Sequence, residues 1–171
     1  MALQIPLRLR VLEALTATLE QAQYFYRDDA QTTSLAGKVF RGRVLFGDTD
    51  PLPMLSILEA PLMPEQIPSP PDSTDNAGGW DLLIQGFVDD DFENPTDPAH
   101  YLMAVTKQRL AYEKARNRNF AILGLGKHVT DISWGAGVVR PPDEISAKAY
   151  FWLPVTLELV EDLAKPFDVN L

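Results

Sequence analysis

The first regular pattern along the chain is helical and lies between about Pro6 and Gln23. Pro6 suits a first helical turn, because the N–H that proline lacks has no partner there. Apolar side chains then recur at a spacing of three and four residues, which places them on one stripe: Leu7, Val11, Leu12, Ala14, Leu15, Leu19 and Ala22. The pattern predicts an amphipathic helix with one buried face.

After Gly37 the pattern changes to alternation with a period of two. Residues 38–46, KVFRGRVLF, predict a strand with Phe40, Val44 and Phe46 on one face, and Val39, Arg41, Arg43 and Leu45 on the other. GDTDP has the composition of a turn, and a second strand is predicted at 52–59, so we expect a hairpin. Arg41 and Arg43 would then lie near Glu59, either as an ion pair within the chain or as a surface that faces an acidic neighbour.

Residues 60–79 hold five prolines and two adjacent glycines, with little apolar content. Such a segment buries too little surface to offset the entropy cost of ordering it, so we expect a long mobile loop. Three further strands are predicted at Trp80–Val88, 128–135 and 147–160. Pro154 indicates an edge or a bulge within the last of these strands.

A second helix is predicted from Pro98 to about Asn117, with Asp97 as its N-cap. Its predicted core-facing stripe consists of Tyr101, Ala104, Val105, Ala111, Tyr112 and Ala115. The opposite face holds Met103 and Leu110 among polar residues, namely Thr106, Lys107 and Lys114. Two apolar side chains on a polar face are either exposed incidentally or mark a contact between subunits.

This order of elements predicts one α+β domain over residues 1–171. We expect a mainly antiparallel or mixed sheet, with an N-terminal helix and a central helix packed on it. No apolar run approaches the roughly 20 residues that a transmembrane helix needs. The N-terminus has arginines within its apolar pattern and does not resemble a signal peptide, so we expect the protein to be made and kept in the cytoplasm.

Charge is unevenly distributed along the sequence. The net charge is −9, but the 63 residues between Arg43 and Lys107 hold twelve acidic residues and no basic one. The remainder therefore carries 15 basic and 12 acidic residues, or +3. The acidic middle is either a solvated face or one half of a self-complementary protein, whose copies would meet head to tail and close into a ring.

Residues with reactive chemistry are sparse. The chain has no cysteine and only two histidines, His100 and His128. Asp89, Asp90 and Asp91 are consecutive, and successive side chains of an extended chain point to opposite sides, so they do not match a metal site. Neither a nucleophile elbow nor a phosphate loop is present. We therefore expect no catalytic, cofactor-binding or metal-ligating residues.

Two segments carry a family resemblance: the GKVFRGRVLFG strand followed by LPMLSILEAP, whose strand ends in Glu59, and the WDLLIQGFV strand, which runs through acids and NPTDPAHYL into a helix. Together they resemble the tail terminator (tail completion) proteins of long-tailed bacteriophages. With the N-terminal helix, the proline-rich loop and the long C-terminal strand, the resemblance covers Leu7 to about Val160.

The resemblance implies a non-enzymatic ring protein, with six copies, at the head-proximal end of the virion tail. Such a ring caps the tail tube, ends its polymerisation and joins it to a head-neck connector, while DNA passes through its channel. The 60–79 loop would order on docking, and an acidic lining would repel the phosphates of the DNA. Another tail or neck component, such as a tube subunit or a head-completion adaptor, is the alternative, and a metal-dependent hydrolase built on the acidic cluster is a more distant one.

The candidate subunit or channel surface follows from these patterns. It comprises the following residues: Arg41, Arg43, Glu59, Asp89, Asp90, Asp91, Met103, Lys107, Leu110 and Lys114.

Overall fold

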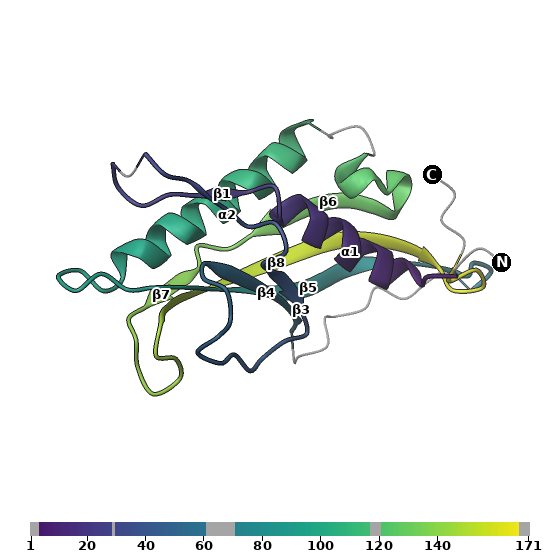
Figure 1. Ribbon diagram of the computed structural model, residues 1–171. Coiled ribbons are helices and arrows are strands. Elements are labelled where there is room, and N and C mark those ends of the chain that lie inside the picture. The colour runs from purple at the N-terminus through teal and green to yellow at the C-terminus, as the bar shows by residue number, and fades with distance from the viewer. Residues whose placement is uncertain (1–3, 29, 61–70, 117–120, 168–171) are drawn as a thin grey trace.

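The computed structural model describes residues 4–28, 30–60, 71–116 and 121–167. Two α-helices and a mixed sheet make up its architecture, which confirms the predicted α+β class (Figure 1). The described elements are α1 (Leu7–Leu19), β1 (Gln23–Tyr24), β2 (Thr33–Ser34), β3 (Val39–Arg41), β4 (Met54–Glu59), β5 (Asp75–Val88), α2 (Asp97–Arg116), η1 (Ile122–Gly124), η2 (Gly126–His128), β6 (Val129–Trp134), β7 (Val138–Arg140) and β8 (Ala149–Asp162).

The two longest strands, β5 and β8, form the centre of the main sheet. They pair antiparallel over their whole length, from Asp75 opposite Asp162 to Val88 opposite Ala149. The strand order is β3-β4-β5-β8-β6, and β7 pairs with β8 beyond the end of β6. A separate small hairpin joins β1 to β2. The sheet therefore brings residues near 80 and near 155 into direct register.

Both helices cover the same face of the main sheet (Figure 1). Alternate residues of the strands point to this face, so their apolar side chains pack under the helices to form the core. Gly86 of β5 has no side chain because the ring of Phe151 on β8 lies over it, and a Cβ there would stand 2.1 Å from Phe151 Cε1. The main contributors to this core are Val11, Leu15 and Leu19 of α1, Leu82 and Ile84 of β5, Leu102 and Leu110 of α2, and Phe151, Leu153 and Leu157 of β8.

The predicted hairpin between 38–46 and 52–59 is wrong. Strands β3 and β4 are parallel, with Val39 opposite Leu55 and Arg41 opposite Ile57. The first strand ends at Arg41 because Gly42 adopts a positive φ of 65°, which turns the chain out of the sheet. Residues 42–53 then form the crossover that a parallel connection requires. Arg41 therefore lies opposite Ile57, two residues before Glu59 at the end of β4.

The predicted long loop is shorter than expected, because β5 begins at Asp75 rather than at Trp80. Gly78 and Gly79 lie in the strand and pair with Leu159 and Glu158. The prediction of mobility for 61–70 lies outside the described residues.

The strands predicted at 128–135 and 147–160 are confirmed as β6 and β8. Pro154 lies in a central strand rather than at an edge, at the place where the neighbour of β8 changes from β6 to β7. Gly135 N–H donates to the Pro154 carbonyl across this junction. The N–H that proline lacks therefore falls at an interruption of the ladder, where its absence breaks no regular pair.

The predicted core face of the second helix is wrong except at Val105, which is buried in the core. Leu110 is fully buried, whereas Ala104, Ala111 and Tyr112 are exposed. The polar residues that suggested an outward face make hydrogen bonds within the fold. Thr106 Oγ1, for example, donates to the Leu102 carbonyl. The helix is rotated so that this face lies on the sheet. Within the described residues, no helix is long and apolar enough to cross a membrane.

Candidate functional site

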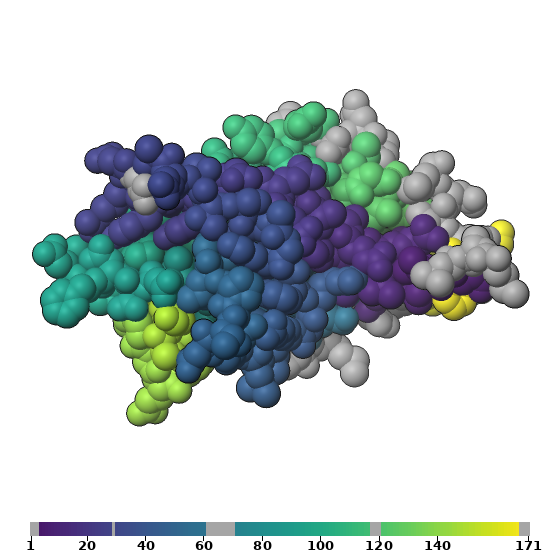
Figure 2. All heavy atoms as spheres, viewed as in Figure 1, coloured from purple at the N-terminus to yellow at the C-terminus, as the bar shows by residue number. Residues whose placement is uncertain are grey.

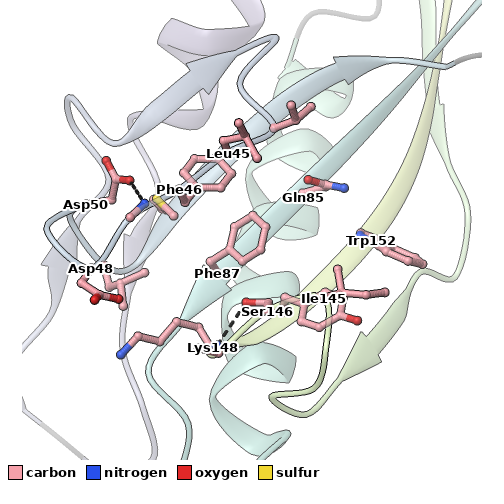
Figure 3. Close-up of a pocket in the computed structure, with 16 residues that line it drawn as sticks. Leu45, Phe46, Asp48, Asp50, Gln85, Phe87, Ile145, Ser146, Lys148 and Trp152 are labelled. Carbon is pink, nitrogen blue, oxygen red and sulfur yellow. Dashed lines mark hydrogen bonds between the residues drawn. The ribbon is translucent and has the colours of Figure 1, made fainter.

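A pocket of about 290 Å³ lies on the face of the sheet opposite the helices (Figure 3). Two loops, 42–53 and 141–148, border it, and the strands β4, β5 and β8 form its floor. The pocket is lined mainly by apolar side chains, namely Val44, Leu45, Phe46, Leu52, Met54, Phe87, Ile145, Ala147, Tyr150 and Trp152, together with Gly47, Asp48, Asp50, Gln85, Ser146 and Lys148.

The floor of the pocket is aromatic because of the strand register. Met54, Phe87 and Tyr150 lie directly opposite one another across β4, β5 and β8, so their side chains share one face. The ring centroids of Phe46 and Phe87 are 4.9 Å apart, and those of Tyr150 and Trp152 are 5.6 Å apart. These rings form a second, smaller core beneath the pocket.

The rim of the pocket exposes apolar side chains. Leu45 of loop 42–53 is 83% exposed and Ile145 of loop 141–148 is 69% exposed (Figure 3). Val44, next to Leu45 in the chain, also lines the pocket and is 65% exposed. Clustered apolar side chains around a concave surface are typical of an interaction site, whereas singly scattered ones are not.

Loop 42–53 is held in place by Asp50. Its carboxylate accepts a hydrogen bond from the Gly47 N–H at 2.6 Å and pairs with the guanidinium of Arg43. The Gly47 hydrogen bond, followed by Arg43, lowers the pKa of Asp50. Arg43 also stacks over the rings of Phe40 and Phe46, at 4.7 and 5.1 Å. The contacts of Asp50 and Arg43 therefore hold loop 42–53 in one conformation.

Loop 141–148 has an equivalent brace in Asp143. Its carboxylate accepts hydrogen bonds from the N–H groups of Ile145 and Ser146 and, at 2.9 Å, from the hydroxyl of Tyr150. Although burial opposes the change, these donors lower the pKa of Asp143. Burial raises the pKa of Tyr150, and the hydrogen bond to Asp143 adds to the effect.

The three consecutive aspartates lie beside this pocket and point to different partners. Asp89 pairs with Lys148 at 2.7 Å, and this hydrogen bond raises the pKa of Lys148. Asp91 accepts hydrogen bonds from the Tyr26 hydroxyl and from two backbone N–H groups of its own turn, and the Tyr26 bond is the largest cause of its lowered pKa. Asp90 is exposed.

The braced turn at 89–94 presents Phe92, which is 99% exposed, to solvent. Among the residues that the structure describes, no group of three or more His, Cys, Asp or Glu side chains could hold a metal ion.

The remaining predicted surface residues lie apart from one another. Arg41 pairs with Glu13 of α1 at 3.7 Å and Arg43 pairs with Asp50, so among the described residues neither arginine pairs with Glu59. The prediction that Leu110 forms a subunit contact is wrong, because this side chain is in the core. Met103 packs against Gly137 rather than projecting from the surface.

Lys107 and Lys114 attach α2 to the edge of the sheet. Lys107 Nζ donates to the carbonyl of Ala136, and Lys114 Nζ donates to that of Ile132 at 2.9 Å. Lys114 also pairs with Asp131, whose carboxylate accepts the N–H of Ile132. The N–H and the carbonyl of Ile132 are therefore both hydrogen-bonded to side chains on this edge strand. Neither group is free to pair with another strand, which blocks the addition of one there.

Charge is divided between the two layers of the fold. The acidic residues of the sequence's middle do not form one face, since Asp75 and Asp89 lie at opposite ends of β5. Instead, α1 and α2 carry six basic and three acidic residues, a net charge of +3. The strands of the main sheet carry two basic and seven acidic residues, a net charge of −5.

The pocket was missed at the sequence level. Its only signal was the apolar content of two segments that otherwise have turn composition, at 44–46 and at Ile145. The chain matches no protein-family model and no curated protein.

Proposed function

We propose that this protein is a structural subunit that works as a closed ring of identical copies. The observation that carries the proposal is the division of charge, with +3 on the helices and −5 on the strands of the main sheet. A subunit of a ring uses two different surfaces to meet its two neighbours. Contacts between the helix layer of one copy and the sheet layer of the next would join opposite charges, whereas contacts between like layers would repel.

The protected sheet edge supports the same proposal. Lys114 and Asp131 occupy the backbone groups of Ile132, so copies are not expected to join by extending the sheet at β6. A contact made through side chains has a fixed geometry, and that allows a ring to close rather than continue as a fibre.

The tail-terminator role rests on the resemblance of the strand and loop segments described above. In this role the ring, of six copies, ends the polymerisation of a phage tail tube and joins the tube to a head-neck connector. We assign the turn at Asp89–Asp91 to the channel surface, where Asp90 would repel the phosphates of passing DNA.

The proposal is tested with the purified chain, alone and mixed with tail tubes, by native mass measurement and negative-stain electron microscopy. We expect closed rings that weaken between roughly 50 and 500 mM salt, because exposed charges are screened. Filaments instead of rings would favour a tube subunit. A single chain under all conditions, with no ring at the tube end, would refute the proposal.

Charge reversals provide a sharper version of the test. Arg116 on α2 and Glu158 on β8 are exposed and take part in none of the ion pairs between described residues. We expect Arg116→Glu and Glu158→Lys each to weaken assembly, while the charge-conserving controls Arg116→Lys and Glu158→Asp assemble like the wild type.

A further inference from the structure

The pocket combines an apolar lining with an acidic surround. Six acidic residues line it, pair with its lining or adjoin it in the chain, and they are Asp48, Asp50, Asp89, Asp90, Asp143 and Glu144. Only three basic residues accompany them, namely Arg43, Arg140 and Lys148, which leaves a net charge of −3. A matching partner therefore has an apolar side chain flanked by cations.

The exposed ring of Phe92 does not meet this requirement. It stands on a turn with Asp90 and Glu93, and that turn adjoins the same pocket through the ion pair of Asp89 and Lys148. Placing the Phe92 turn of a second copy at the pocket would bring two acidic surfaces together, which electrostatic repulsion disfavours.

The start of α1 has the required chemistry. Leu9 is 40% exposed and lies between Arg8 and Arg10 in the sequence. Arg41 lies nearby through its ion pair with Glu13, and Arg8 pairs with Glu161 of β8 at 3.3 Å, so these five charged side chains have a net charge of +1. This segment offers an apolar side chain with cations on either side, complementary to a pocket of −3.

The two surfaces lie on different parts of the molecule. In Figure 1 the first turn of α1 lies towards the right-hand end of the view, while loops 42–53 and 141–148 project from the lower side towards the left. In Figure 2 the two loops, in blue and lime, lie below and to the left of α1, in purple. Contacts between these two surfaces are therefore head to tail, as a ring requires.

We infer that the pocket between loops 42–53 and 141–148 receives the Leu9 side chain of a second copy of this chain, with Arg8 and Arg10 against the acidic surround. The inference rests on the proposed ring and names one of its contacts. It assigns an apolar anchor in a preformed pocket to each subunit junction, with charge pairs around it.

The test uses one variant for each side of the contact. Leu9→Asp removes the anchor, and Leu45→Asp places a charge on the apolar rim. Both side chains are substantially exposed, so both variants should fold, as circular dichroism and thermal unfolding will check. We expect each to weaken self-association by roughly 10- to 100-fold in sedimentation velocity, as for an anchor residue. Phe92→Asp is the matched control, an equally polar change at a 99% exposed site, and should assemble like the wild type.

Mixing the two variants distinguishes a head-to-tail contact from a symmetric one. The Leu9→Asp chain keeps its pocket and the Leu45→Asp chain keeps its anchor, so an equimolar mixture has one intact junction. We expect a 1:1 heterodimer that does not grow further. A symmetric contact of pocket with pocket would give no heterodimer and would overturn the inference.

The failures of the inference and of the proposed ring can be told apart. Closed rings of wild-type stability in both Leu9→Asp and Leu45→Asp would overturn the docking of Leu9 and leave the ring function standing. A wild-type chain that stays monomeric at about 1 mM overturns this contact, because its dissociation constant would lie in the millimolar range or above. Absence of rings even on tail tubes would overturn the proposed function itself.

Discussion

The orientation of α2 decides whether Leu110 belongs to the core or to a subunit contact, and the substitution Leu110→Ala separates these possibilities. In the structure the Leu110 side chain has no exposed surface and lies in the main core beneath the helix. Truncation would therefore leave a cavity between α2 and the strands. The loss would be in the stability of the subunit and not in its assembly.

The size of the effect follows from the burial. Replacing a fully buried leucine by alanine costs about 3 kcal/mol, from the lost transfer free energy together with the cavity that remains. For a chain of 171 residues, each kcal/mol lowers the melting temperature by about 2–4 °C. We therefore expect the melting temperature to fall by roughly 6–12 °C.

The assay is urea and thermal unfolding followed by circular dichroism, with the mass in solution measured at the same concentration. Tyr112→Ala is the control on the same helix, because Tyr112 is 54% exposed on the outward face. Its expected cost is within about 0.5 kcal/mol. If Leu110→Ala unfolds like the wild type but loses oligomers, then α2 packs with its other face inward and the reasoning here is refuted.

Three further changes test the packing, the acidic turn and the sheet edge. Gly86→Ala should cost roughly 1–3 kcal/mol in urea unfolding, because its Cβ would overlap the ring of Phe151, and wild-type stability would contradict that packing. The pKa of Asp91 is lowered in the folded state, so its contribution is present above the unfolded value of about 3.9 and is lost as the pH falls through the folded pKa. The protection of the turn's backbone amides, taken relative to the intrinsic exchange rate at each pH, should therefore fall below about pH 4 in the wild type and be low at all pH values in Asp91→Asn; equal protection at pH 7 would argue against the brace. Lys114→Ala should free the carbonyl of Ile132 on the edge of the sheet and raise aggregation in light scattering above that of Lys114→Arg, whereas identical scattering would show that the edge is closed by other means.

Local periodicity was enough to predict most of the elements. The N-terminal helix has a clear helical period, and β5, β6 and β8 correspond to segments whose composition predicted strands, so all four were found from the sequence. Where the prediction was wrong, the deciding interaction lay far away in the sequence. Gly78 and Gly79 belong to a strand because Leu159 and Glu158 pair with them.

The face of α2 was mispredicted for a different reason. Sequence patterns assume that polar side chains face water, but Thr106 bonds to the backbone one turn earlier and Lys114 reaches the carbonyl of Ile132. Glu113, also buried, accepts the N–H of Leu123, a residue held at a positive φ of 57°. When buried polar groups find partners within the fold, hydrophobicity alone no longer indicates which face is inside.

The pocket could not be predicted because it is assembled from three separate parts of the sequence. Loop 42–53, the end of β5 and residues 145–152 meet only once the parallel β3–β4 pair and the antiparallel β5–β8 pair have formed. The first of these pairings contradicts the hairpin that the turn composition favours.

Three acidic residues, of which only Asp91 was singled out in the sequence, hold loops in place, and this bears on how the protein would bind a neighbour. Asp50, Asp91 and Asp143 each accept hydrogen bonds from backbone N–H groups of their own loop, and all three have lowered pKa values. Loops fixed in this way lose little conformational freedom on association, so more of the contact energy is available for affinity. The exposed leucine and isoleucine at the pocket rim are thus presented by loops that are held by internal hydrogen bonds, which is the arrangement expected of a preformed interaction site.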